Sequence, residues 1–307
     1  MTAARARDRI DIVGTAAILA ATLCWMSGPL FIRYLSGHLD LFSQNFWRYL
    51  VAMLFWLPWF VVWHRCGKIT ASLMRRAAAV SAVNIVLQSF WAWSYYLVLP
   101  GFGTLLTRSS MVWTAAFCIF YFPAERPLVR SGRFWAGAAL TVAGLTGIVM
   151  GRGGLGCFGS MAAVAVPLFT AVFWSAYTVA AKIAFAGTDA RAGFAMVSVY
   201  TAAGLAVLAM LFGSPLRVFD APGGVPAAVA VSGVLSIAIA HVLYYVSIRR
   251  IGGTIPAILL QVSPFLTLLL SMIVFGERLR TWQWAGAVVL MAGSFLSILA
   301  QERLKRS

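Results

Sequence analysis

Charge is scarce in this sequence, and acidic charge is the scarcest. Charged residues make up 10% of the 307 positions, and only 8 residues are Asp or Glu. An ordinary soluble domain has roughly 25% charged residues. All the acids fall in predicted termini or loops: Asp8, Asp11, Asp40, Glu125, Asp189, Asp220, Glu277 and Glu302. Because ion-coupled transporters usually hold a carboxylate inside the bilayer, the usual proton or sodium relay has no evident place here.

The sequence also lacks the patterns of a disulfide framework, a metal site or an intramembrane enzyme. Its cysteines stand far apart with no paired spacing, so we expect buried, inert thiols at Cys24, Cys66, Cys118 and Cys157. It has no HExxH, no CxxC and no acid within a predicted span. We therefore expect neither an enzyme nor a bound metal or cofactor.

Apolar residues dominate instead, at 62% of the sequence, with a mean hydropathy of +0.88. A bilayer-spanning helix needs roughly 20 apolar residues in a row. Ten such runs are present, over residues 13–35, 41–63, 77–98, 103–123, 134–150, 159–184, 191–212, 225–248, 254–275 and 281–300. They are continuously apolar, without the alternation of barrel strands. The predicted fold class is an all-α integral membrane protein with ten transmembrane helices.

The net charge of +16 follows membrane topology rather than nucleic-acid binding. One set of alternate loops and termini holds seventeen Lys and Arg, whereas the other holds five: Arg33, Arg152, Arg217, Arg278 and Arg280. Positively charged loops stay on the cytoplasmic side. We expect a multi-pass protein of a bacterial inner membrane, with both termini cytoplasmic and membrane lipids as partners. A monomer is compatible with the sequence, and no nucleic-acid partner is expected.

The two halves of the sequence resemble each other at a constant offset. Shifted by 149 residues, Trp25 meets Trp174, the pair Tyr95 and Tyr96 meets a second tyrosine pair at 244 and 245, and "WAGA" at 135–138 meets "WAGA" at 284–287. Because each half has an odd number of predicted spans, the second half must enter the membrane from the opposite side. We expect two inverted five-helix repeats, residues 1–151 and 152–307, that form one membrane domain.

Several motifs occur once in each half and in the same order. Each half has a tryptophan in its first span ("TLCWMSGPLFIR" and "AVFWSAYTVAAK") and a glutamate-arginine turn before its last span ("AERP" and "GERL"). Each last span also has glycines seven residues apart. As an ordered set over nearly the whole chain, these features resemble the EamA-type members of the drug/metabolite transporter superfamily, including its aromatic amino acid exporter branch.

The resemblance implies a basket of ten helices around a central cavity. Helices 1, 3, 4, 6, 8 and 9 would line this cavity, with helices 5 and 10 as support. Family members export amino acids and other small metabolites. One departure is "SSMVW" in the first half, where the second half has the family-like "VSPF"; it leaves a first-half hinge near Ser110 less defined.

The third predicted helix carries a polar and aromatic face. Asn84, Gln88, Trp91 and Tyr95 follow one another at steps of four, three and four, so they share one side of a helix. An unpaired amide is costly in hydrocarbon, so this side must face other helices or water. For Gln88 and Trp91 we favour a cavity wall suited to small amphipathic solutes over a role in joining helices. For Tyr95 and Tyr96 an interfacial aromatic belt is equally compatible.

Apart from anchors near span ends such as Arg33 and Lys182, the predicted spans contain two arginines and one histidine. Arg108, just inside the fourth span, can receive a substrate carboxylate or extend to the outer headgroups. Arg48 has the same choice; there we favour snorkelling or helix packing, because the resemblance does not place helix 2 at the cavity. His241 fits a hydrogen-bonded core residue better than a proton carrier.

Prolines and glycines mark candidate hinges and scaffold positions. Pro29, Pro167 and Pro264 interrupt helices 1, 6 and 9 and are hinge candidates, although a plain packing kink explains each of them as well. The glycines of the fifth and tenth spans allow close helix approach and are interpreted as scaffold: Gly137, Gly144, Gly286 and Gly293.

These observations predict a carrier that exports small amphipathic metabolites, chiefly amino acids including aromatic ones, by alternating access. The expected substrate-binding residues are Asn84, Gln88, Trp91, Tyr95, Arg108, Trp25, Trp174, Tyr244, His241 and Gln261. An exporter of drugs or other metabolites is the alternative. A channel is disfavoured by the inverted repeat and by the lack of a charge ring, and an intramembrane enzyme by the missing catalytic groups.

Overall fold

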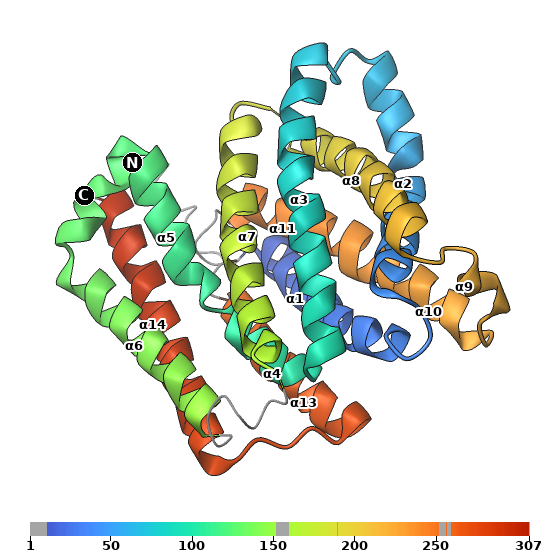
Figure 1. Cartoon of the computed structure of the whole chain (residues 1–307). Helices are drawn as coiled ribbons and strands as arrows, with labels where there is room; N and C mark the ends of the chain where they lie inside the picture. Colours follow the sequence, from blue (N-terminus) through green and yellow to red (C-terminus); the bar gives the residue numbers. More distant parts are fainter. Residues whose placement is uncertain (1–10, 152–159, 189, 252–255, 257–258, 307) are drawn as a thin grey trace.

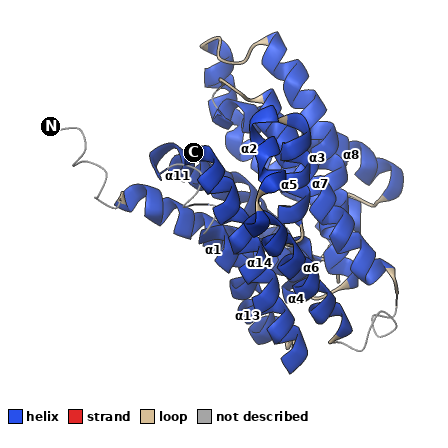
Figure 2. Ribbon diagram, turned by 90° about the vertical axis from the view of Figure 1, so that its left-hand side faces the viewer, coloured by secondary structure: helices blue, strands red, loops and turns tan. Residues whose placement is uncertain are grey.

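In the structure, a computed structural model, every regular element of the described residues is a helix, and short turns and loops join them (Figure 2). The described residues are 11–151, 160–188, 190–251, 256 and 259–306. Seven helices are long and apolar enough to cross a membrane, and residues 260–275 form a shorter apolar helix. The prediction of an all-helical membrane protein is confirmed.

The helices follow the predicted spans. The first half comprises α1 (Ile12–Leu35), α2 (Leu41–Arg65), α3 (Ala71–Leu97), α4 (Pro100–Thr107), α5 (Ser110–Tyr121), the 3₁₀ segment η2 (Pro123–Arg130) and α6 (Gly132–Met150). The second half comprises α7 (Ala162–Ala184), α8 (Ala190–Phe212), α9 (Arg217–Asp220), α10 (Gly224–Ser232), the π-helical segment η4 (Gly233–Ile239), α11 (Ala240–Ile251), η5 (Leu260–Val262), α13 (Ser263–Phe275) and α14 (Thr281–Arg306).

Some predicted features fall outside the described residues. These are the starts of the sixth and ninth spans at residues 159 and 254, and also Arg5, Arg7, Arg9, Asp8, Arg152, Cys157 and Asp189. Among the described thiols, Cys118 is buried, but Cys66 is exposed where α2 ends. The expectation of buried thiols is therefore wrong for Cys66.

Two predicted spans are not continuous α-helices. The fourth, expected over 103–123, consists of α4 and α5, which are separated at Arg108 and Ser109. The amides of these two residues bond three residues back, to Leu105 (3.1 Å) and Leu106 (3.2 Å), in the tighter 3₁₀ pattern. The eighth, expected over 225–248, passes through the π-helical segment η4. Apolar periodicity predicted these spans, but it did not predict either irregularity.

Helix pairing places α6 and α14 along each other at one side of the molecule (Figure 1). A Cβ atom on Gly144 would lie 2.6 Å from the carbonyl oxygen of Gly286, and one on Gly286 would lie 2.8 Å from the carbonyl oxygen of Gly144. Gly137 and Gly293 approach in the same way. The backbones therefore touch at two levels, as the scaffold interpretation of these glycines requires.

The remaining long helices pack around a shared interior. α2 packs against α8, α3 against α7 and α8, and α1 against α11 and α13 (Figure 1). The largest apolar cluster joins α2, α3 and α8 through residues such as Trp56, Leu73 and Phe194. The side chains that face this interior from α1, α2, α3, α7 and η4 form the site described below.

Asp40 connects two turns at one end of the bundle. Its carboxylate accepts the backbone amides of Phe42 (3.0 Å) and Ser43 (2.9 Å) at the start of α2, and that of Ser214 (2.9 Å) beyond α8. Burial raises the pKa of Asp40, but these hydrogen bonds outweigh burial and hold its pKa below the ordinary value. The carboxylate thus caps α2 and fixes it to the end of α8.

We expect Gly286→Ala to lower the thermal stability of the purified protein, because its methyl group would meet backbone atoms of α6 that cannot move aside. Overpacking of this kind costs about 1–3 kcal/mol. Gly132→Ala is the matched control, since a Cβ atom at the start of α6 meets nothing within 4 Å. Thermal unfolding in detergent should give a lower Tm for Gly286→Ala only. Equal Tm values would mean that α6 and α14 are not in backbone contact.

Candidate functional site: a small polar and aromatic cavity

A small cavity lies between α1, α2, α3, α7 and the η4–α11 segment, with a volume of about 50 Å³. It is lined by Trp25, Gly28, Arg48, Tyr49, Asn84, Leu87, Gln88, Trp91, Trp174, Tyr177, Ser236, Ile237 and His241. Ligand pockets usually offer about 300–1,000 Å³, and a buried water needs roughly 10–15 Å³. In this conformation the cavity has room for a few water molecules.

The α3 wall carries most of the predicted stripe. Asn84, Gln88 and Trp91 line the cavity together with Leu87, one turn of helix after another. Tyr95 does not reach it: this side chain is fully buried, its ring lies 5.0 Å from that of Trp91, and its hydroxyl lies 3.3 Å from Oγ1 of Thr104 on α4. A lipid-facing aromatic belt is therefore wrong for Tyr95.

Asn84 holds three helices together beside the cavity. Its Nδ2 donates to Oγ1 of Thr201 on α8 (2.9 Å) and to the hydroxyl of Tyr49 on α2 (3.3 Å). Its Oδ1 accepts from Nε2 of Gln88 (3.4 Å). The Asn84 amide therefore has both of the roles that were weighed for the polar face of this helix: it joins helices, and it lines the cavity.

Aromatic rings form two opposite walls. On one side, the Trp25 ring lies 5.1 Å from that of Tyr244 and 5.2 Å, edge on, from that of His241. On the other side, the Trp91 ring lies 5.7 Å from that of Trp174. Such rings present large apolar areas with a single polar tip. The walls therefore suit a flat or apolar group, and the amides between them suit a polar one.

The π-helical segment η4 shapes the third side. His241 Nδ1 donates to the carbonyl oxygen of Ile237 (2.6 Å), and its ring stacks on Phe194 with centroids 4.0 Å apart. Since a carbonyl oxygen only accepts, Nδ1 carries the proton, which fits the interpretation of a hydrogen-bonded core histidine. Ser236 lies 3.2 Å from the Ser27 hydroxyl of α1. π-helical turns are rare and occur frequently at functional sites.

Arg48 corrects the expectation for helix 2. It is only 2% exposed, lines the cavity, and donates from Nε to Oγ of Ser232 on α10 (3.0 Å). Snorkelling to the headgroups is therefore wrong, whereas helix packing describes the Ser232 bond. Its Nη1 has no hydrogen-bond partner among the described residues. Together, Arg48 and Tyr49 bring α2 to the cavity, which the family resemblance did not imply.

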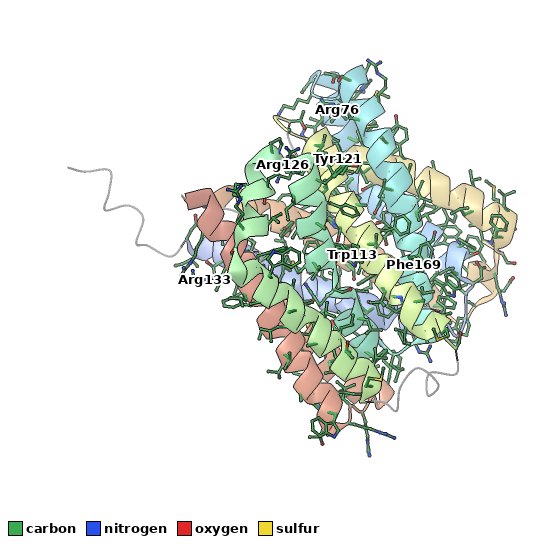
Figure 3. All side chains as sticks on the ribbon, turned by 60° about the vertical axis from the view of Figure 1, so that its left-hand side comes forward. Arg76, Trp113, Tyr121, Arg126, Arg133 and Phe169 are labelled. Atoms are coloured by element: carbon green, nitrogen blue, oxygen red, sulfur yellow. The ribbon has the colours of Figure 1, made fainter. Side chains whose placement is uncertain are left out.

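A second, larger hollow of about 500 Å³ lies between α3, α5 and α7. Its walls are almost wholly apolar: Ala79, Val80, Val83, Phe117, Ala176, Val179, Ala180, Ile183 and Ala184. Its two polar residues, Arg76 and Tyr121, lie at the same end of these helices, and Trp113 and Phe169 lie farther along (Figure 3). Because this hollow offers so few polar contacts, the smaller cavity is the better candidate for a polar solute.

Comparison with known proteins agrees with a transporter fold. Residues 161–299 match the family model described as the EamA-like transporter family. The matched region lies in the second half of the chain and covers less than half of all residues. Over 95% of this chain and 98% of the other, the fold is similar to that of a solved structure described only as "Crystal structure of protein", with a TM-score of 0.64 and 20% sequence identity. A comparison with curated proteins found no match.

Residues 161–299 are therefore similar to EamA-like transporters, and seven of the described helices are long and apolar enough to cross a membrane. Within the described residues, no group of three or more His, Cys, Asp or Glu side chains could hold a metal ion.

The structure brings six of the ten predicted site residues to the cavity: Trp25, Asn84, Gln88, Trp91, Trp174 and His241. Tyr244 packs behind Trp25, and Tyr95 behind Trp91. Arg108 ends α4, and Gln261 is buried in η5; neither lines the described cavity. The sequence analysis did not include four residues that line the cavity: Arg48, Tyr49, Tyr177 and Ser236. Only Arg48 had a signal in the sequence, as a charge within a predicted span.

The three prolines predicted as hinges differ in where they lie within their helices. Pro29 and Pro167 lie inside α1 and α7, as expected. Pro264 lies in the first turn of α13, where a proline removes no helical hydrogen bond. It therefore lies directly after the 3₁₀ segment η5, where α13 begins, and not inside a continuous α-helix.

Glu277 of the "GERL" turn fixes the start of α4, although it lies far away in sequence. Its carboxylate is 4% exposed and accepts the backbone amides of Gly101 (2.8 Å) and Phe102 (2.7 Å). A carboxylate suits the positive N-terminus of a helix. Glu125 of the corresponding "AERP" turn instead pairs with Lys182 (3.2 Å), whose side chain is 48% exposed.

We expect Glu277→Gln to destabilise the helix bundle more than Glu125→Gln does. The glutamine keeps one acceptor for two buried amides, and hydrogen bonds to a charged group contribute about 1.5–3 kcal/mol. The exposed Glu125–Lys182 pair contributes at most about 1 kcal/mol. Thermal unfolding of the two purified variants compares these effects. A Tm loss for Glu125→Gln as large as that for Glu277→Gln would contradict the assigned role of Glu277.

Proposed function

We propose that the chain exports small amphipathic metabolites, chiefly amino acids including aromatic ones, from the cytoplasm by alternating access. The observation that carries this proposal is the cavity itself, where two ring walls face a row of amides on α3. Once the helices separate, an aromatic or branched side chain would lie between the Trp25 and Trp91–Trp174 walls, and its polar end would meet Asn84 and Gln88. An exporter of other metabolites or drugs remains the alternative.

Helix contacts support two exchangeable halves. α1, α3 and α4 of the first half correspond to α7, α11 and α13 of the second. The contact between α3 and α7 therefore has a counterpart between α11 and α1, and both contacts are present. The contact between α4 and α7 likewise has a counterpart between α13 and α1, and both are present. The remaining two contacts, of α2 with α8 and of α6 with α14, each join a helix to its own counterpart in the other half. This is the contact pattern that an inverted repeat of residues 1–151 and 152–307 requires.

The small volume of the cavity supports a cycle in which helices separate to admit substrate. About 50 Å³ is well below the usual size of a ligand pocket. We assign the movement to the helices beside the cavity, with Pro29 and Pro167 as hinges, and the fixed frame to the glycine-packed pair α6 and α14. The excess of Lys and Arg in one set of loops supports cytoplasmic termini in a bacterial inner membrane.

We expect Trp91→Ala and Gln88→Ala to weaken transport, because they remove a ring wall and an amide from the cavity. An aromatic contact contributes about 0.5–1.5 kcal/mol beyond its buried area, so Trp91→Ala should lower apparent affinity by about 2- to 13-fold. The measurement is counterflow of labelled amino acid by purified protein in liposomes, with substrates chosen by a thermal-shift screen of the twenty amino acids and a few drugs.

Trp93→Ala is the matched control for this experiment. It removes the same side chain from the same helix, but Trp93 is 40% exposed and does not line the cavity. Its counterflow should equal that of the unmodified protein. If Trp91→Ala and Gln88→Ala change neither rate nor substrate preference, the cavity is not the binding site. If no solute shows trans-stimulation, the carrier proposal itself fails.

A further inference from the structure

The cavity contains a buried positive charge that the proposed function does not explain. Of the described residues that line it, Arg48 alone carries a permanent charge. Its side chain makes one hydrogen bond, from Nε to Ser232, and its Nη1 is buried without a partner. A guanidinium presents two parallel donors at its outer end, a geometry that matches a carboxylate.

No described carboxylate neutralises this charge. The described ion pairs are Lys182 with Glu125 and Arg250 with Asp11. The other two acids in contact with backbone amides are Asp40, which holds α2 and Ser214, and Glu277, which holds α4. Burying an ion costs several kcal/mol unless a counter-ion and further hydrogen bonds offset that cost. Such a cost persists where function requires it.

The bond to Ser232 accounts for the position of Arg48 but not for its charge. A serine hydroxyl needs a single donor, which a neutral glutamine could supply without the cost of a buried ion. Polar side chains line the same cavity as Arg48, namely Tyr49, Asn84 and Gln88. The arrangement is therefore one cation beside neutral hydrogen-bonding groups, enclosed by rings.

We propose that Arg48 binds the carboxylate of the transported solute, so that the substrates are small monocarboxylates with an apolar or aromatic body. This inference rests on the proposed transport function. A single guanidinium balances one negative charge, which favours a carboxylate over a doubly charged phosphate. The ring walls receive the body of the solute. Arg48 replaces Arg108 in this role, because Arg108 ends α4 and does not line the cavity.

Three probes separate the charges of the solute: 3-phenylpropionate carries only the carboxylate, phenethylamine only the ammonium, and phenylalanine both. We expect the full-length protein to bind the two carboxylates, measured as a thermal shift in detergent, and to exchange them in liposomes. Arg48→Gln should weaken both carboxylates by about 10- to 100-fold, the range for hydrogen bonds to a charged group. It should leave any response to phenethylamine unchanged.

Three further variants keep the test decisive. Arg75→Gln removes an exposed arginine from the start of α3 and should change nothing. Ser232→Ala removes only the Nε bond, so it should lower Tm but keep the preference for carboxylates. Arg48→Lys retains the charge and should bind carboxylates better than Arg48→Gln, which remains informative if Arg48→Gln misfolds.

The possible results distinguish this inference from the transport proposal. Equal losses for phenethylamine and 3-phenylpropionate, or carboxylate selectivity that is lost in Arg108→Gln but kept in Arg48→Gln, would overturn the role of Arg48 and leave transport intact. Carboxylate binding that depends on Arg48 without any counterflow would support Arg48 and overturn the carrier proposal.

Discussion

The interior of this bundle is governed by one constraint: a polar group that lies among lipid-embedded helices must find its partner within the protein. Asn84 meets this constraint most fully, because its amide bonds to Tyr49 of α2, Thr201 of α8 and Gln88 of its own helix. These bonds fix α2, α3 and α8 around one point. The polar face of α3 can then open only toward α1, α7 and η4, and the cavity lies there.

The same constraint explains what the sequence could predict. Polar residues at helical spacing must share an interior face, so the stripe through Asn84, Gln88 and Trp91 was readable, and the tryptophans aligned by the offset, Trp25 and Trp174, were found with it. The glycine pairs of α6 and α14 were predictable as packing positions, because glycines at regular spacing in an apolar helix allow a close approach of two backbones. Both signals are local in sequence and periodic.

What the sequence could not predict depends on contacts between distant segments. Arg48 was visible as a costly charge, but only the approach of α10 and η4 to α2 decides that it faces the cavity rather than the headgroups. Glu277 looked like a loop acid, yet it caps α4 across the molecule. The break at Arg108 and the π-helical turn of η4 leave the apolar pattern unchanged, so hydropathy carries no trace of them.

The buried charge also bears on how the carrier would cycle. When the cavity opens, water can solvate Arg48. When the cavity closes without a solute, this solvation is lost, and the described hydrogen bond to the Ser232 hydroxyl offsets only a small part of the loss. On our proposal, a bound carboxylate restores the lost interaction, so the loaded protein closes at a lower cost than the empty one. A ligand shifts a conformational equilibrium by its differential affinity for the two states, and here that affinity favours the closed state. On this proposal, return of the empty carrier is the slow step, so exchange of one solute for another is faster than net efflux.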